Sequence, residues 1–306
     1  MTAHVWAHLI VGPRDEPFLG ALLESLTGVA QVLVVNDNAP DPSPHHQTLR
    51  SSPFGRDGRI LLDRTPFVDF SHARNRCLEL HRAHGGPPWA AFVDSDEVHA
   101  PAAQRVADRL HLVPGDVDFV DGYTWHFFAS FDLYTSIERR MMFFRVHPDL
   151  HWVGTVHEQL HGSVGRRLAL PYVYGHYGHA LPVRRHAEKE HHYRALGHEV
   201  YRNPAYAGIL VPQEQLDEID VASYFHAKWP FALRFGARHP AAAQATIALL
   251  RAQYAADYAR AEALARAAQP PLVRARNALL RLNYEQRWRS RALDPRARRL
   301  LSGRLT

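Results

Sequence analysis

The first hundred residues alternate between short apolar runs and segments in which apolar side chains recur at helical spacing. The apolar runs predict four strands, at residues 5–11, 32–35, 60–63 and 89–94. Helical spacing predicts a helix over residues 16–27, and Ser71 is placed to cap a second helix that ends near residue 83. Strands that alternate with helices indicate crossover connections and a mainly parallel open sheet.

The pattern changes after a further helix predicted near residues 102–112. Apolar runs then predict adjacent strands, at residues 119–128, 140–146, 153–160 and 171–174. From about residue 182 the chain is predicted to be helical, with apolar stripes formed by Ile247, Leu250, Tyr254 and Tyr258 and by Leu280, Tyr284 and Trp288. We therefore expect an α/β domain over residues 1–180 and a helical extension over residues 181–306.

Composition narrows the class of protein without identifying it. The 306 residues are 46% hydrophobic and 22% charged, which is typical of a globular protein and excludes disordered, collagen-like and coiled-coil chains. Cys77 is the only cysteine, so an intrachain disulfide or a cysteine-rich zinc module is excluded. No apolar run approaches the roughly 20 residues of a spanning helix, and we expect a cytoplasmic protein.

Basic charge is concentrated near the C-terminus. Residues 272–306 contain ten arginines and only two acids, Glu285 and Asp294, for a net charge of +8, whereas the rest of the chain carries −3. A solvated helix face is the simplest interpretation, and anionic lipid, an acidic acceptor, nucleic acid and a homodimer interface are the alternatives. No recognisable nucleic-acid module accompanies the arginines, so we expect peripheral contact with an anionic membrane surface rather than nucleic acid.

Three of the predicted strands end in or next to an aspartate, at Asp37, Asp63 and Asp94. Ligands of open α/β sheets bind at the carboxyl ends of the strands, so these side chains face a prospective site. Asp94 and Asp96 follow a buried strand directly, and side chains two apart in an extended segment point the same way. The pair is therefore predicted to bind a hard cation that leaves positions open for phosphate oxygens; an acidic turn is the alternative.

Several motifs recur in an order that resembles a known family, the inverting family 2 glycosyltransferases of the GT-A fold, and in particular bacterial members with a VHE segment. The matching segments are Arg14-Asp15-Glu16, Val34-Val35-Asn36-Asp37-Asn38, Asp69-Phe70-Ser71-His72-Ala73-Arg74-Asn75, Asp94-Ser95-Asp96, Trp152-Val153-Gly154-Thr155-Val156-His157-Glu158 and His176-Tyr177-Gly178. The resemblance implies transfer of a sugar, with inversion, from a nucleotide-diphospho-sugar, most often a UDP-sugar. It also implies Mn2+ or Mg2+ as cofactor and a glycan, lipid-linked or small-molecule acceptor.

The resemblance also suggests roles for individual residues. It implies that Asp94, Asp96 and His176 bind the metal, with His157 as the alternative third ligand, and that Glu158 is the catalytic base, with Glu97 or Asp132 as alternatives. Trp152 and His157 would lie on the acceptor side, where Trp125 is a further aromatic candidate. The residues implied in donor binding are Glu16, Asp37, Arg74, Asn75 and Asp94.

Two other functions compete with this interpretation. Residues 157–161 match the HExxH signature of zinc peptidases, which requires both histidines on one face of a helix. Gly154 and Gly162 bracket the segment and β-branched residues precede it, so we predict extended structure instead. The second alternative is an inactive GT-A-like binding module, but Asp94, Asp96 and Glu158 are all present.

A histidine-rich stretch is predicted to be a solvated helix face and comprises His186, His191, His192 and His198.

Overall fold

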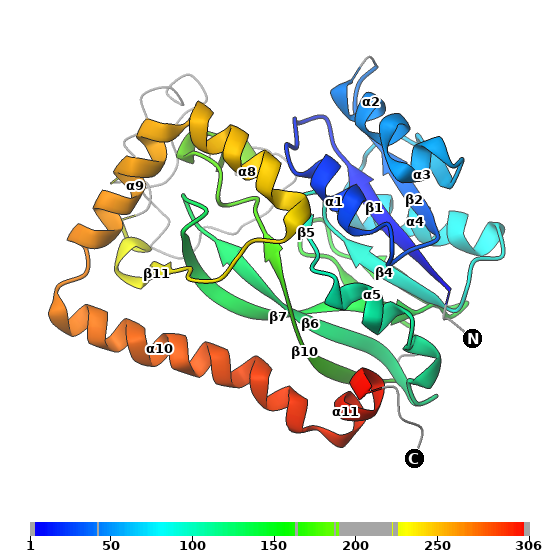
Figure 1. Ribbon diagram of the computed structural model, residues 1–306. Helices are drawn as coiled ribbons and strands as arrows, with labels where there is room; N and C mark the ends of the chain where they lie inside the picture. The colour runs from blue at the N-terminus through cyan, green and yellow to red at the C-terminus, as the bar shows by residue number, and fades with distance from the viewer. Residues whose placement is uncertain are drawn as a thin grey trace.

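The computed structural model describes residues 4–41, 43–162, 165–186, 188–189, 222 and 226–302. The chain has an α/β fold, and nine strands of the described residues form one sheet (Figure 1). Its N-terminal half is parallel, with β1 between β2 and β4 and with β3 beyond β2 at the edge. These four strands are β1 (Val5–Val11), β2 (Val32–Asp37), β3 (Ile60–Asp63) and β4 (Trp89–Val93). The predicted class and its parallel strands are confirmed.

Helices connect the parallel strands, as the alternating pattern predicts. They are α1 (Leu19–Ser25), α2 (Pro44–Ser51), α3 (Pro53–Arg56) and α4 (Phe70–Ala83). The predicted cap of α4 is wrong by two residues, because the side chain of Asp69 caps the helix and Ser71 lies in its first turn. Asp69 Oδ1 accepts a hydrogen bond from the backbone N–H of His72 at 2.7 Å, which satisfies an otherwise unpaired donor of the helix start.

The second half of the sheet is mixed. β7 runs antiparallel to both β4 and β6, β10 is parallel to β6, and β5 and β11 are short antiparallel additions. Between β5 and β6 lie α5 (Ala102–Ala107) and the 3-10 helix η1 (Leu110–Leu112). The strands are β5 (Glu97–Val98), β6 (Val117–Phe127), β7 (Leu133–Arg145), β10 (Arg166–His176) and β11 (Leu233–Arg234).

The strand predicted over residues 153–160 is instead a hairpin. β8 (His151–Val153) and β9 (Gln159–His161) pair in antiparallel register as a separate two-stranded sheet. The connection bends because Gly154 has a φ of 112° and His157 a φ of 58°, both in the left-handed region. His157 lies in a turn and His161 in a strand, so the HExxH residues do not share a helix face, which excludes the peptidase arrangement.

The described C-terminal residues are mostly helical and pack on the sheet and on α1. Leu233 and Ile247 share a core cluster with Phe18, and Leu300 shares another with Leu9. The predicted stripe from Ile247 to Tyr258 therefore covers two helices, which meet at Tyr254. The C-terminal elements are η5 (Trp229–Phe231), α8 (Ala241–Gln253), α9 (Ala255–Ala267), α10 (Pro271–Arg289), η6 (Ser290–Leu293) and α11 (Pro295–Ser302). The division at residue 180 stays a prediction.

Among the helices of the described residues, none combines the length and the apolar character needed to cross a membrane.

Candidate active site

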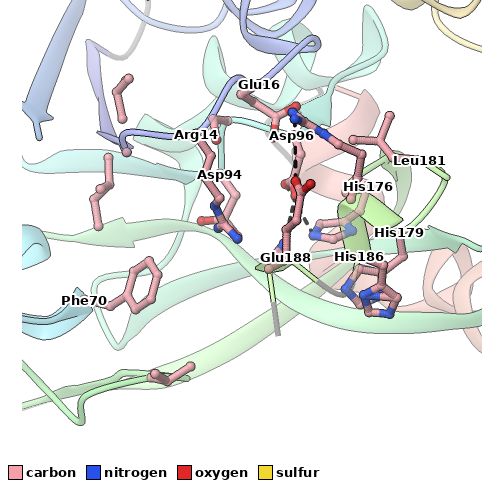
Figure 2. A pocket seen from close by; sticks show the side chains of 18 of the residues that line it. Arg14, Glu16, Phe70, Asp94, Asp96, His176, His179, Leu181, His186 and Glu188 are labelled. Carbon is pink, nitrogen blue, oxygen red and sulfur yellow. Dashed lines mark hydrogen bonds and ion pairs between the residues drawn. The ribbon is translucent and has the colours of Figure 1, made fainter. Parts of the chain in front are cut away.

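A cavity of about 550 Å³ opens at the carboxyl ends of β1 and β4. The loop after β1 and the turn after β4 form one wall, and the β8–β9 hairpin and the residues after β10 contribute others. Figure 2 shows Asp96 and His176 close together in the cavity, with Phe70 on the opposite side. The cavity lies where an open sheet with parallel strands places its ligands.

Asp94 is held by two arginines from distant parts of the chain. Its Oδ1 is in contact with Arg74 Nη2, and its Oδ2 lies 3.0 Å from Arg140 Nη2. Burial opposes ionisation of Asp94, but the two guanidinium groups outweigh burial and lower its pKa. Arg74 comes from α4, as the sequence indicates, whereas no sequence motif marks Arg140, which lies within the long strand β7.

Arg74 also joins Asp94 to the VHE segment. Its Nε donates to Glu158 Oε1 at 3.2 Å, and its Nη1 donates to the backbone carbonyl oxygens of His8 and Val93 at 3.3 and 3.0 Å. The guanidinium carbon lies 4.1 Å from the ring centroid of Phe92, and Arg74 is 3% exposed. Arg74 therefore links the middle of β1 and the end of β4 to the β8–β9 hairpin, an arrangement that the sequence motifs alone do not reveal.

Asp96 lies in a second group of charges. Its Oδ1 is 3.3 Å from His176 Nε2, and its Oδ2 accepts from Lys189 Nζ at 3.3 Å. Burial opposes ionisation, but His176 and Lys189 outweigh it and hold the pKa of Asp96 well below its usual range. Burial and then the charge of Asp96 raise the pKa of the nearby Glu16 to about 8.

Asp94 and Asp96 both line the cavity but take different partners, so their convergence on one cation stays a prediction. The chain turns at residues 94–97, where the backbone N–H of Glu97 donates to the carbonyl oxygen of Asp94 at 3.1 Å. Because the segment is a turn rather than an extended strand, the alternation of side chains along a strand does not place the two carboxylates. Asp94 faces Arg74 and Arg140, and Asp96 alone is paired with His176.

Asp96 and His176 have the chemistry to bind one divalent cation. Among the described residues Asp96 Oδ1 is buried with no partner beyond His176 Nε2 at 3.3 Å, and burial lowers the pKa of His176, which favours the neutral imidazole that metals bind. In the part of the chain that the structure describes, no group of three or more His, Cys, Asp or Glu side chains is arranged to hold a metal. The two residues fit as part of a metal site that phosphate and water oxygens would complete.

His126, His176, His179 and His186 all line the cavity, and sequence analysis places only His176 in the site. The ring centroids of His126 and His176 are 4.9 Å apart, and those of His179 and His186 are 4.4 Å apart and stacked (Figure 2). Burial lowers the pKa of all four. The prediction of a solvated face is wrong for His186, which is 4% exposed. The other members of that stretch, His191, His192 and His198, lie outside the described residues.

The three candidates for the catalytic base lie in different environments. Glu158 lines the cavity and its side chain is 10% exposed. Glu97 is fully buried behind Asp94, and burial and then the charge of Asp94 raise its pKa to about 8. Asp132 is paired with Arg251 at 2.7 Å and is not among the cavity residues. Of the three, only Glu158 can meet a molecule in the cavity.

Three further residues of the predicted site lie outside the cavity lining. Asp37 is buried with its Oδ2 2.7 Å from His46 Nε2. The side-chain amide of Asn75 hydrogen-bonds to the backbone of Trp152. It donates to the Trp152 carbonyl oxygen at 2.9 Å and accepts from the Trp152 N–H at 2.7 Å. Trp152 is 4% exposed and packs in a core cluster with Phe144. These side chains support the walls of the cavity, because their polar groups or rings are already engaged inside the protein. Trp125 likewise packs on Phe235, with ring centroids 5.1 Å apart.

Comparison with known proteins gives only distant similarity. No family model and no curated protein matches the chain. It is similar to the structure of glucosyl-3-phosphoglycerate synthase from Mycobacterium tuberculosis in complex with Mn2+, UDP and glucosyl-3-phosphoglycerate, at 14% identity over 40% of this chain and 44% of that one, with a TM-score of 0.30. It is also similar to S. aureus TarS 1-349, at 13% identity over 98% and 90% of the two chains, with a TM-score of 0.35. The chain thus spans less than half the length of the mycobacterial synthase.

Proposed function

We propose that this protein is a metal-dependent inverting glycosyltransferase that moves a sugar from a nucleotide-diphospho-sugar, a UDP-sugar by first preference, to an acceptor hydroxyl. The observation that carries the proposal is the arrangement around Asp96. A buried carboxylate paired with His176 lies beside Lys189 in a cavity at the carboxyl ends of parallel strands. This combination suits a cation and the phosphate groups that it binds.

The chain offers positive groups for the diphosphate of the donor. Arg14 lines the cavity, and its Nη1 is a buried atom with no hydrogen-bond partner among the described residues, so a phosphate oxygen would satisfy it. Lys189 Nζ lies 3.3 Å from Asp96 Oδ2 and would hold a second oxygen. A Mn2+ or Mg2+ ion held by Asp96 and His176 would supply Lewis-acid stabilisation of the leaving diphosphate.

Aromatic side chains are available for the nucleoside end of the donor. Phe67 and Phe70 line the cavity and pack edge to face, with ring centroids 5.3 Å apart. Phe70 lies across the cavity from the histidines (Figure 2), so a donor could extend from the rings to Asp96. A planar ring gives a base a surface on which to stack. These residues replace Asp37 and Asn75 in the proposed donor site.

Glu158 is the proposed base. In an inverting transfer the acceptor hydroxyl attacks the anomeric carbon from the side opposite the diphosphate, and a carboxylate takes the proton as the bond forms. Glu158 follows the turn of the β8–β9 hairpin, and Arg74 holds its Oε1 at 3.2 Å from Nε. His157 lies beside it on the cavity lining and is the remaining acceptor-side candidate.

The test is a thermal-shift panel of UDP, GDP, dTDP and CMP, each with and without Mn2+, because a ligand that binds only the native state raises its melting temperature. We expect one nucleoside diphosphate to give a shift that depends on Mn2+. Asp96→Ala should abolish that shift. Asp15→Ala is the matched control, because Asp15 also lines the cavity but its side chain is 65% exposed and lies 3.7 Å from Arg185.

Catalysis is tested separately with Glu158→Gln, which should bind the donor as the wild type does and turn over at least about a hundredfold more slowly. Full activity in this variant would remove Glu158 from its role. Nucleotide binding without turnover of any sugar in the wild type would favour the binding-module alternative. The absence of any Mn2+-dependent shift would overturn the proposal altogether.

A further inference from the structure

The exposed side of α10 carries an apolar stripe that the core does not use. Leu272, Leu279 and Leu282 are 85%, 68% and 56% exposed. Together with the exposed Ala275 they follow one another at spacings of three and four residues, which places them along one face of the helix. Leu293, just beyond α10, is 67% exposed and lengthens this set.

The face of α10 that meets the core is a different one. Asn277 is buried, and Tyr284 and Trp288 pack against the cluster that contains Tyr123 and Phe127. These residues recur at their own helical spacing, on the side of the helix away from Leu272 and Leu279. Figure 1 shows α10 as the long helix along the outside of the molecule. α10 is therefore apolar on two sides, of which only one has a partner within the described part of the chain.

Arginines surround the exposed stripe. The chain from residue 272 to 302 contains nine arginines and two acids, a net charge of +7. Glu285 is shared by Arg281 and Arg289, at 3.1 and 3.2 Å. The exposed arginines of α10 and of the segment that follows it are Arg274, Arg281, Arg287, Arg289, Arg291, Arg296, Arg298 and Arg299.

We infer that this surface, the α10 stripe with its arginine border, binds an anionic lipid bilayer from one side. Exposed leucines flanked by arginines match the boundary between acyl chains and negatively charged headgroups, where an amphipathic helix lies in the plane of the interface. A second copy of the chain is a poorer partner, because a symmetric contact through the stripe would bring two strongly positive borders together. The inference does not depend on the proposed catalytic function.

An exposed aromatic ring lies against Arg276 in the first turns of α10. Phe231 is 45% exposed, and the guanidinium carbon of Arg276 lies 4.2 Å from its ring centroid. Arg276 Nη2 donates to the carbonyl oxygen of Pro230 at 2.6 Å, which fixes η5 against the start of α10. Phe231 thus adds an exposed ring beside the arginine border of α10, and an aromatic side chain is suited to the interfacial region.

The experiment is flotation of the full chain with vesicles of phosphatidylcholine, with and without phosphatidylglycerol. We expect binding to the anionic vesicles that weakens as salt is raised, and little binding to phosphatidylcholine alone. The double variant Leu279→Ser with Leu282→Ser should bind anionic vesicles at least about tenfold more weakly, because it loses apolar area at the interface. Leu249→Ser is the matched control, since Leu249 is 67% exposed but lies on α8, and it should bind as the wild type does.

The contribution of the arginines to membrane binding is tested with the double variant Arg274→Gln and Arg296→Gln. It should weaken binding to anionic vesicles about tenfold or more and make that binding less dependent on salt. All of these positions are exposed, so equal melting temperatures will show that the variants are folded. Absence of wild-type binding to anionic vesicles would overturn the inference, as would unchanged binding of the leucine double variant. The inference would also be overturned if the wild type sediments as a dimer, does not bind vesicles, and is dissociated by the leucine substitutions. That result would identify a second copy of the chain as the partner of the stripe.

Discussion

Replacing Arg74 by methionine should show how much a single buried cation contributes to the site. Methionine keeps much of the side-chain length beneath Phe92 but removes the charge that faces Asp94 and Glu158 and the donors to two backbone carbonyl groups. Removing one partner from a buried ion pair costs about 3–5 kcal/mol. Asp94 keeps Arg140 at 3.0 Å, so we expect Arg74→Met to lower the free energy of unfolding by about 3 kcal/mol, the lower end of that range.

The same helix provides a matched control. Arg76 also pairs with two acids, Asp63 at 3.0 Å and Glu79, but its side chain is 35% exposed, whereas that of Arg74 is 3% exposed. Exposed pairs contribute about 0–1 kcal/mol, so Arg76→Met should cost about 1 kcal/mol or less. Urea denaturation of both variants, with unchanged slopes, measures the difference.

A double-variant cycle then identifies the cause of the loss. In Arg74→Met the carboxylate of Glu158 has lost its guanidinium partner, so adding Glu158→Gln removes a poorly compensated charge. The double variant should be more stable than the sum of the two single changes predicts, by about 0.5–3 kcal/mol. Equal losses for Arg74→Met and Arg76→Met, or strictly additive effects in the cycle, would refute the argument that buried charge pairing holds this site together.

Two further predictions follow from single positions. Burial lowers the pKa of His99 to about 4 from its ordinary value of 6.5, so unfolding takes up a proton between these pH values, and stability should fall by up to about 3 kcal/mol as the pH drops from 6.5 to 4. His99→Gln should make the unfolding free energy flatter over that range, and a profile parallel to the wild type would contradict this. A β-carbon at Gly178 would lie 2.0 Å from Asp96 Oδ2, so Gly178→Ala should displace that carboxylate and weaken Mn2+-dependent nucleotide binding about tenfold or more. Gly12→Ala, at a cavity position with nothing within 4 Å of the added carbon, should bind normally in the same titration.

Local sequence pattern determined the parallel half of the sheet. Continuous apolar runs bounded by polar residues define strands, and residues 5–11 and 60–63 are strands over those same ranges, the first buried and the second at the sheet edge. The same reasoning fails at residues 153–160, where a predicted strand is a hairpin. Its turn depends on positive φ at Gly154 and His157, and a run of β-branched residues next to them does not reveal that conformation.

The sequence by itself also determined that acids follow β4 and that a histidine and a VHE segment come later in the chain. Which of them meet was decided by tertiary structure. Asp94 pairs with Arg140 from β7, and Asp96 pairs with His176 and Lys189, at a turn over residues 94–97 that the apolar pattern does not predict. Partners 46 and 93 residues away leave no local pattern. Charge pairing in a buried site is set by the packing of distant elements, and only the folded chain specifies it.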